Sequence, residues 1–327
     1  QSFQQQQQQQ QQQPSNGQSQ PSSQIEMICR PVVGGNVDVL RHLLTSNHVD
    51  SEILDQLDAR GFAALHYAAT ATSGPLSEAL IDVLANSGAD VDVSDQWGNT
   101  PLHWAASAGN EVAINRLLAH DADASAQNLL GETPLHTAAS TVWRTSPNCC
   151  TALCRNGAED NLPDCYGGET ALHKAASANS AANVRVLIFF GAHVNATDED
   201  GNTPLHSAAG TGARSVIRPL ISAGAEPNVR NQDEETPLQV AALLGYPGMV
   251  DFLVGVGADV GIIPSPSPSN RQAMVRSGSP SVLTSSSSSS SSSSRRSAAR
   301  QQEAKRKMLA NSNTISATSE PSPMVII

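Results

Sequence analysis

A seven-residue segment occurs six times in this sequence and constrains its fold more than any other feature. The copies begin 37, 33, 37, 33 and 33 residues apart, and each has a leucine, then His or Gln, one variable residue and two alanines. Such regular self-similarity is typical of a solenoid, in which each copy packs against its neighbours. The copies read "AALHYAA", "TPLHWAA", "TPLHTAA", "TALHKAA", "TPLHSAA" and "TPLQVAA", starting at Ala63, Thr100, Thr133, Thr170, Thr203 and Thr236.

Each copy predicts a short helix followed by a second one. Threonine at the first position caps a helix by accepting a bond from an early backbone N–H, and proline next to it suits the first helical turn. An apolar stretch follows, and then a glycine that is typical of a helix end; in copy two, Asp121 holds that position. Helices this short are marginal alone, so the fold must be stabilised by stacking.

The period and the Thr-Pro-Leu-His-x-Ala signature resemble the ankyrin-repeat family over about residues 36–262. The resemblance implies an all-α solenoid of helix-turn-helix repeats with β-hairpin-like finger loops, flanked by disordered tails. We expect a Gln-rich disordered tail at 1–24, an N-terminal capping half-repeat at 25–57 and a Ser/Pro-rich basic tail at 264–327. The expected repeat domain, 58–263, divides into repeats at 58–94, 95–127, 128–163, 164–197, 198–230 and 231–263.

Two copies are longer than the others. The segments "TATSGPLSE" from Thr70 and "STVWRTSPN" from Ser140 follow copies one and three. We expect both to enlarge the turn between the two helices of a repeat, where insertions in solenoids often mark a binding face.

Five histidines recur at one position of the copies and raise the question of a metal site. Metal ligands converge on one point, whereas one histidine per repeat forms a ladder. The family resemblance implies that these histidines are structural and hydrogen-bond between neighbouring turns; Gln239 takes the place in copy six. The five are His66, His103, His136, His173 and His206.

Four cysteines gather within one repeat, at Cys149, Cys150, Cys154 and Cys165. Free cysteine behaves as a small apolar residue, and Cys154 aligns with a core leucine of the second helix, so we expect core packing. A zinc site or a redox sensor is the alternative. The sequence has no P-loop and no G-x-S-x-G, and it pairs no nucleophile with a base. We therefore expect no enzyme, no cofactor and no small-molecule substrate.

In the ankyrin family, partners dock on the concave face and on the fingertips. In this sequence those positions are the residue after each motif histidine and the two residues before each finger glycine. The alternative for the two tryptophans is that they pack on each other or on neighbouring repeats. The predicted partner-binding residues are Tyr67, Trp97, Trp104, Leu129, Leu130, Thr137, Tyr166 and Lys174.

The charge distribution limits the partner classes. Residues 26–260 carry 28 Asp and Glu against 11 Lys and Arg, so the repeats lack the basic footprint of a nucleic-acid reader. No apolar run approaches the ~20 residues of a membrane helix. We expect a monomeric, cytoplasmic protein, with the nucleus as the alternative location.

The C-terminal tail adds candidate regulatory sites. Ser265, Ser267, Ser279 and Ser322 precede prolines and are predicted phosphorylation sites. The basic cluster Arg295–Lys307 has three interpretations: nuclear import, docking on the acidic repeats, or no role.

The leading hypothesis is a non-enzymatic ankyrin-repeat adaptor that binds a protein partner through its concave groove and finger loops. The alternatives are the regulatory part of a larger enzyme, such as a kinase, ubiquitin ligase or acyltransferase, and a nuclear transcriptional regulator.

Overall fold

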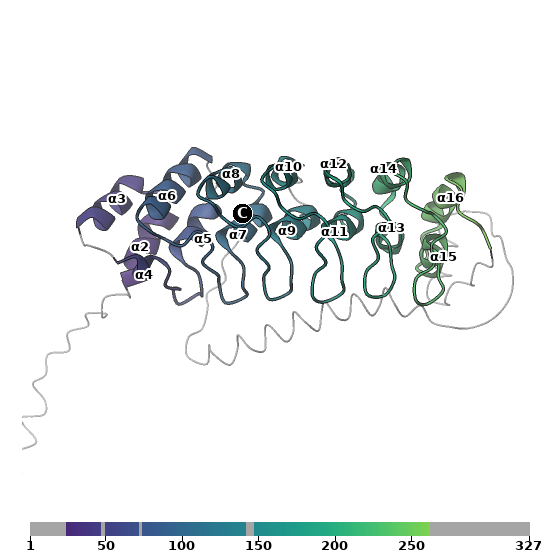
Figure 1. Ribbon diagram of the computed structural model, residues 1–327, viewed down its shortest axis with the longest axis horizontal. Helices are drawn as coiled ribbons and strands as arrows, with labels where there is room; N and C mark the ends of the chain where they lie inside the picture. The colour runs from purple at the N-terminus through teal and green to yellow at the C-terminus, as the bar shows by residue number, and fades with distance from the viewer. Residues whose placement is uncertain (1–23, 47–49, 72–73, 142–146, 262–327) are drawn as a thin grey trace, which may run out of the picture.

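The computed structural model describes residues 24–46, 50–71, 74–141 and 147–261. These residues form an elongated stack of helix pairs, with loops hanging from one edge (Figure 1). The described residues contain no β-strand, and the architecture is that of an all-α ankyrin-repeat solenoid. Each pair packs mainly on the pairs before and after it, as a solenoid requires.

Each copy of the repeat forms two antiparallel helices, which we call inner and outer. The inner helices lie beside the loops, and the outer helices form the row farthest from them (Figure 1). The inner helices are α5 (Ala64–Ala69), α7 (Pro101–Ala108), α9 (Pro134–Ser140), α11 (Ala171–Ser177), α13 (Pro204–Thr211) and α15 (Pro237–Leu243). The outer helices are α6 (Gly74–Asn86), α8 (Glu111–Ala119), α10 (Pro147–Arg155), α12 (Ala181–Phe190), α14 (Ile217–Ser222) with the preceding turn η1 (Arg214–Val216), and α16 (Pro247–Gly255).

The leucine and the two alanines of each copy supply the core. In copy two, Leu102, Ala105 and Ala106 are fully buried. The small alanine side chains let adjacent inner helices approach closely, and the outer helices add larger residues such as Leu117 and Leu187. The result is one continuous core along the stack, built from contacts that no single copy could make.

The N-terminal end contains a helix that the sequence analysis did not predict. Besides α3 (Val37–Ser46), which lies within the expected capping half-repeat, the structure has α2 (Gln24–Val33) and the short α4 (Ser51–Leu54). The α2 helix buries Ile25, Ile28 and Val32 and packs against α5. It lacks the repeated motif and contains a proline, Pro31, which is why the sequence pattern did not reveal it.

The insertion after copy one lengthens a helix as well as a turn. Outer helix α6 begins at Gly74 and has 13 residues, against nine in α8. Polar side chains hold this region in place: the Ser77 hydroxyl donates to the Ala68 carbonyl at 2.7 Å, and the Asn110 amide donates to Ala69 and Ala71. In the second insertion, residues 142–146 lie outside the described residues.

The finger loops are tight hairpins joined side by side. In copy two, the Asp95 N–H donates to the Asn99 carbonyl at 2.9 Å, and Gly98 between them has φ +76°. A Cβ at Gly98 would lie 2.9 Å from the Leu129 backbone nitrogen of the next finger, so close contact as well as φ requires glycine. In copy six, Glu234 adopts the same left-handed conformation, with φ +60°, and the hairpin is kept.

Candidate partner-binding surface

The five motif histidines join each repeat to the next. Each Nδ1 accepts a hydrogen bond from the backbone N–H three residues earlier, at 3.1 Å. An Nδ1 that accepts from N–H carries no proton, so the proton lies on Nε2, which donates to a carbonyl of the following finger. The Nε2 acceptors are the carbonyls of Asn99, Glu132, Glu169, Asn202 and Glu235, at 2.9–3.0 Å.

This geometry requires neutral histidine. Burial lowers the pKa of all five imidazoles below the ordinary value, and for His206 to about 4. In copy six, the Gln239 Oε1 accepts a hydrogen bond from the Thr236 N–H at 2.9 Å. Gln239 therefore keeps the bond from the backbone N–H three residues earlier, and it does so without a titratable group. One histidine per repeat, each with both nitrogens paired, connects the repeats and leaves no ligand set facing a common point.

The residue after the motif histidine is not left free in three of the six copies. It donates a hydrogen bond to the first residue of its own finger, an aspartate nine or ten positions earlier. The Tyr67 hydroxyl donates to Asp58 at 2.6 Å, and the Trp104 indole N–H donates to Asp95 at 2.9 Å. In copy four, the Lys174 ammonium lies 2.8 Å from Asp164. These aspartates were missed in the sequence, although their spacing from the motif was visible there.

Copies one and two carry what we call the aromatic cluster: Phe62, Tyr67, Trp97 and Trp104. Phe62 lies at its centre, with ring centroids 5.0 Å from Trp104, 5.7 Å from Trp97 and 5.8 Å from Tyr67. All four side chains are half-buried. The two tryptophans therefore pack on Phe62, a residue that the sequence analysis did not single out, and still present part of their surface to solvent.

The neighbouring fingertips extend this apolar surface. The Leu129 N–H donates to the Trp97 carbonyl at 3.0 Å, and the Cys165 N–H donates to the Leu130 carbonyl at 2.8 Å. Leu129 is 64% exposed, and Tyr166, next to Cys165, is 40% exposed. Leu130 is half-buried. The fingers of copies two, three and four thus form a continuous edge on which apolar side chains face solvent.

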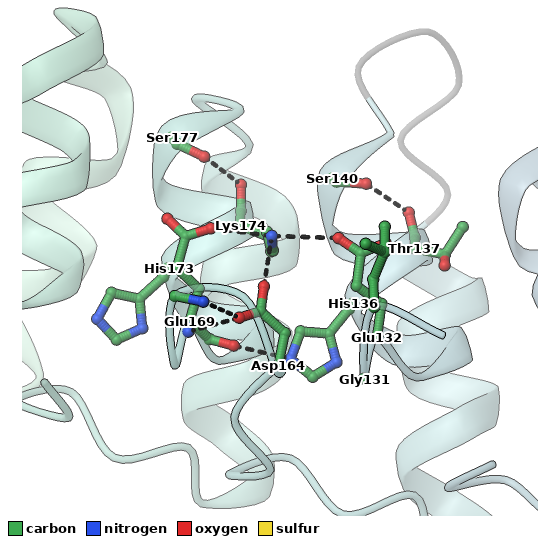
Figure 2. Close-up of polar contacts among 12 residues, drawn as sticks. Gly131, Glu132, His136, Thr137, Ser140, Asp164, Glu169, His173, Lys174 and Ser177 are labelled. Carbon is green, nitrogen blue, oxygen red and sulfur yellow. Dashed lines mark hydrogen bonds and ion pairs between the residues drawn. The ribbon is translucent and has the colours of Figure 1, made fainter. Parts of the chain in front are cut away.

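Copy four holds the Lys174 cluster, which Figure 2 shows as one amine surrounded by carboxylates from two neighbouring repeats. The Lys174 Nζ lies 2.8 Å from Asp164, 2.9 Å from Glu169 and 3.1 Å from Glu132. Burial would lower the pKa of Lys174, but the three carboxylates raise it above its ordinary value. Burial would likewise raise the pKa of Asp164, and the Lys174 ammonium lowers it overall.

Lys174 is only 7% exposed, which counts against the prediction that it contacts a partner. Its ammonium is paired inside the chain, and its hydrogen-bonding capacity of three donors matches its three acceptors. The sequence could not reveal this, because Glu132 comes from the preceding repeat and is brought to Lys174 only by stacking.

The remaining copies have no donor long enough to reach the finger. Thr137 is half-buried, and its hydroxyl bonds to the Thr133 carbonyl of its own helix. In copy five, the finger aspartate Asp198 bonds to Asn202, and burial raises its pKa to about 6. The tyrosine, tryptophan and lysine at this position therefore distinguish copies one, two and four from their neighbours.

The cysteines lie mainly in the core. Cys149 and Cys150 are buried in α10, while Cys154 is half-buried and Leu153 takes the core position that the alignment gave to Cys154. Cys165 is exposed on a finger. Burial raises the pKa of Cys154 to about 12, so its thiol stays protonated. Across the described ranges, no group of three or more His, Cys, Asp or Glu side chains is placed to hold a metal ion.

Two predictions for the C-terminal tail concern residues that the structure does not describe. The serines at Ser265, Ser267, Ser279 and Ser322 and the basic cluster Arg295–Lys307 lie outside them. Among the residues that are described, none of the helices has both the length and the apolar content to cross a bilayer.

Comparison with known proteins finds relatives with repeats of this kind. Two curated proteins are the nuclear factor NF-kappa-B p105 subunits of Mus musculus, 31% identical over 115 residues, and of Gallus gallus, 34% identical over 123 residues. These matches cover 35% and 37% of this chain, and the chain spans 12% of the length of either relative. A similar solved structure is the ankyrin repeat domain of Bcl-3, a member of the IkappaB protein family. It is 28% identical, with a TM-score of 0.58, over 70% of this chain and 97% of that one.

The family comparison covers more than half of the sequence. Residues 71–164, 142–231 and 172–263 match the family described as ankyrin repeats in three copies. Together with the helix pairs, the histidine ladder and the finger hairpins, these matches show that the chain belongs to the ankyrin-repeat family.

Proposed function

We propose that the chain is a non-enzymatic adaptor that binds a protein partner through the finger face of copies one to four. The observation that carries the proposal is that the aromatic cluster and the exposed side chains of Leu129 and Tyr166 lie on adjoining fingers, which are joined by backbone hydrogen bonds. Aromatic residues held in place by their neighbours are typical anchors of protein interfaces. Ankyrin repeats are in general interaction modules, and nothing in this surface pairs a nucleophile with a base.

The charge around this surface favours a partner with basic and apolar groups. Asp58 and Asp95 accept hydrogen bonds from the Tyr67 hydroxyl and the Trp104 indole N–H, and these neutral donors do not cancel the carboxylate charge. Residues 26–260 as a whole carry 28 acidic against 11 basic side chains. Such a field would attract a positively charged partner and orient it before contact.

The similarity to known proteins supports one class of protein partner. The relatives are subunits of a nuclear factor and a member of the IkappaB family. We therefore propose that the partner is a transcription factor subunit and that the protein acts in the cytoplasm or the nucleus.

Affinity capture with the full chain tests the interface. Leu129→Asp and Tyr166→Asp place charge on exposed sites, so they should leave the fold intact and reduce capture of the partner about tenfold or more. Val254→Asp on α16 is the matched control, since Val254 is 41% exposed on the outer row. Equal capture by all three variants would rule out the finger face.

Binding of purified NF-kappa-B subunits tests the partner class. We expect saturable binding that weakens as salt increases, because the repeats are acidic. If the captured partner has no relation to transcription factors while the Leu129 and Tyr166 variants still lose it, the interface stands and the partner class is wrong.

A further inference from the structure

A second apolar site lies on the opposite side of the molecule from the fingers. Phe189 is 82% exposed, the highest value for a large apolar residue in the described part of the chain. It belongs to outer helix α12, in the row of helices farthest from the finger loops (Figure 1). Its ring is supported from one side by Phe190, with centroids 5.2 Å apart in an edge-to-face arrangement.

Phe189 borders an open depression between α12 and α14. Ile188 from α12 and Pro219 from α14 are apolar residues that line the depression, and Arg185 and Arg218 line it too. We call these five residues the Phe189 patch. An apolar depression with two guanidinium groups combines a place for one apolar side chain with two sites for acidic groups.

Neither arginine of the Phe189 patch is neutralised within the described residues. No carboxylate oxygen there lies within 4.0 Å of either guanidinium, and Arg218 instead lies over the Phe252 ring at 5.5 Å. Arg116, on outer helix α8, differs: it is paired with both Asp82 and Glu78. The two exposed arginines therefore retain their charge and their donors for an external group.

The tails of this chain do not supply a complementary occupant. Residues 1–23 carry no charged side chain, and residues 262–327 carry eight Lys and Arg against two Glu. The N-terminal segment is neutral and the C-terminal segment is basic, so neither forms a favourable charge interaction with the two arginines. An extended anionic membrane fits poorly too, because it would face the whole acidic repeat surface, whereas a short peptide meets mainly the groups near the two arginines.

We propose that the Phe189 patch binds an acidic peptide segment of a partner protein, with an apolar side chain of that segment in the depression. Each guanidinium offers paired N–H donors in a planar fork that matches a carboxylate. Phe189 covers the inserted apolar side chain. This site is separate from the finger face, so one protein can hold two partners of opposite charge.

Selection from a dodecapeptide library, displayed on phage and run against the full chain, tests the proposal. A parallel selection uses the full-length Arg185→Glu/Arg218→Glu variant. Both substitutions are at exposed positions, and equal urea midpoints for the two proteins confirm that the fold is kept. Peptides specific to the wild type should contain at least two Asp or Glu beside a Leu, Phe or Trp.

Fluorescence anisotropy with the best such peptide then gives the affinities. Phe189→Ser and the double charge reversal should each weaken binding at least tenfold, whereas Leu129→Asp on the finger face should leave it unchanged. Added salt should weaken binding by the wild type.

Several results would overturn the proposal. The first is selection of peptides that are basic or uncharged, and the second is equal peptide binding by wild type and the Phe189→Ser variant. Self-association that Phe189→Ser abolishes would make a second copy of the chain the occupant, and binding to phosphatidylserine vesicles but to no peptide would make it a membrane. Peptide binding that appears only after residues 262–327 are removed would make it the C-terminal tail. Failure of the finger-face variants in the capture experiment would leave this result unaffected, so the two proposals fail separately.

Discussion

The aromatic cluster and the Lys174 cluster occupy the same place in the repeat and are built with opposite chemistry. In both, the residue after the motif histidine donates to the aspartate that opens its own finger. Tyr67 and Trp104 do so with neutral groups and remain half-exposed. Lys174 does so with a charge, draws in two further carboxylates and is 7% exposed.

The difference teaches how one variable position decides what the finger face presents. A neutral aromatic donor satisfies one lone pair of the aspartate, leaves the negative charge in place and keeps an apolar ring at the surface. The Lys174 ammonium compensates the charge of its aspartate, and all of its donors are then used by the surrounding carboxylates. The aromatic arrangement leaves exposed surface for a partner, whereas the ammonium arrangement is buried between two repeats.

Removing the Lys174 ammonium should have the largest effect. Lys174→Met keeps the length of the side chain but leaves Asp164, Glu169 and Glu132 close together without a cation. Breaking a buried ion pair in this way costs about 3–5 kcal/mol of unfolding free energy. Urea denaturation at pH 7 measures the loss.

A compensated variant serves as the control for this prediction. Lys174→Met combined with Asp164→Asn removes one of the stranded charges and should recover part of the stability. If Lys174→Met alone loses less than about 1 kcal/mol of unfolding free energy, the cluster contributes no more than a solvent-exposed salt bridge does.

Removing Phe62 tests the other region. Phe62→Ala takes away the ring on which Tyr67, Trp97 and Trp104 pack. A fully buried phenylalanine loses about 3–5 kcal/mol on truncation, and Phe62 is half-buried, so we expect about 2 kcal/mol. The tryptophan emission should shift to the red as the rings gain solvent.

Phe189→Ala is the matched control, because it truncates the same side chain at an exposed position. It should change the unfolding free energy by no more than about 0.5 kcal/mol. If both variants lose the same stability, the aromatic cluster does not act as a packed unit.

A third test addresses the histidine ladder that underlies both regions. His206 has a folded pKa of about 4 and an ordinary value of 6.5, so the unfolded chain binds a proton first as the pH falls. The contribution of neutral His206 to the unfolding free energy is present above pH 6.5 and is lost as the pH falls from 6.5 toward 4. At about 1.4 kcal/mol per pH unit, the loss between pH 7 and pH 5 is about 2 kcal/mol.

His206→Gln should remove that loss while keeping the N-terminal bond, as Gln239 does in copy six. Denaturation at pH 7 and pH 5 should therefore show a smaller decrease in the variant than in the wild type. Asp198, whose pKa is raised to about 6, opposes acid destabilisation equally in both proteins and so does not affect the difference. An identical decrease in the two proteins would mean that His206 titrates normally.

Most of the scaffold could be predicted from the sequence, because the features that specify it are local and repeated. Thr100, Pro101 and Leu102 occur together, so the start of each inner helix and its buried face follow from the spacing. Even the exceptions obey the rule: Asp121 and Glu234 stand where other copies have glycine and adopt positive φ. The helix α2 was missed because it lacks the repeated motif.

The state of the surface residues could not be predicted in the same way. Tyr67, Trp104 and Lys174 occupy equivalent positions and look equally available in the sequence. What separates them is the neighbouring side chains: Phe62 lies beside Tyr67 in its own copy and beside Trp104 of the next copy, and Glu132 from the preceding repeat lies beside Lys174. Such contacts depend on the rotation between repeats, which no single copy encodes.

The smallest expected effect is also the sharpest test of the comparison. Tyr67→Phe removes only the hydroxyl that donates to Asp58 and keeps the ring on Phe62. Because the hydrogen bond is to a charged group but lies at a half-exposed site, we expect a loss of about 1 kcal/mol, well below that of Lys174→Met. The freed Asp58 carboxylate should strengthen capture of a basic partner, so stability and binding should change in opposite directions. If binding weakens along with stability, then the neutral donor itself contacts the partner, and the aromatic region acts through its polar groups as well as its rings.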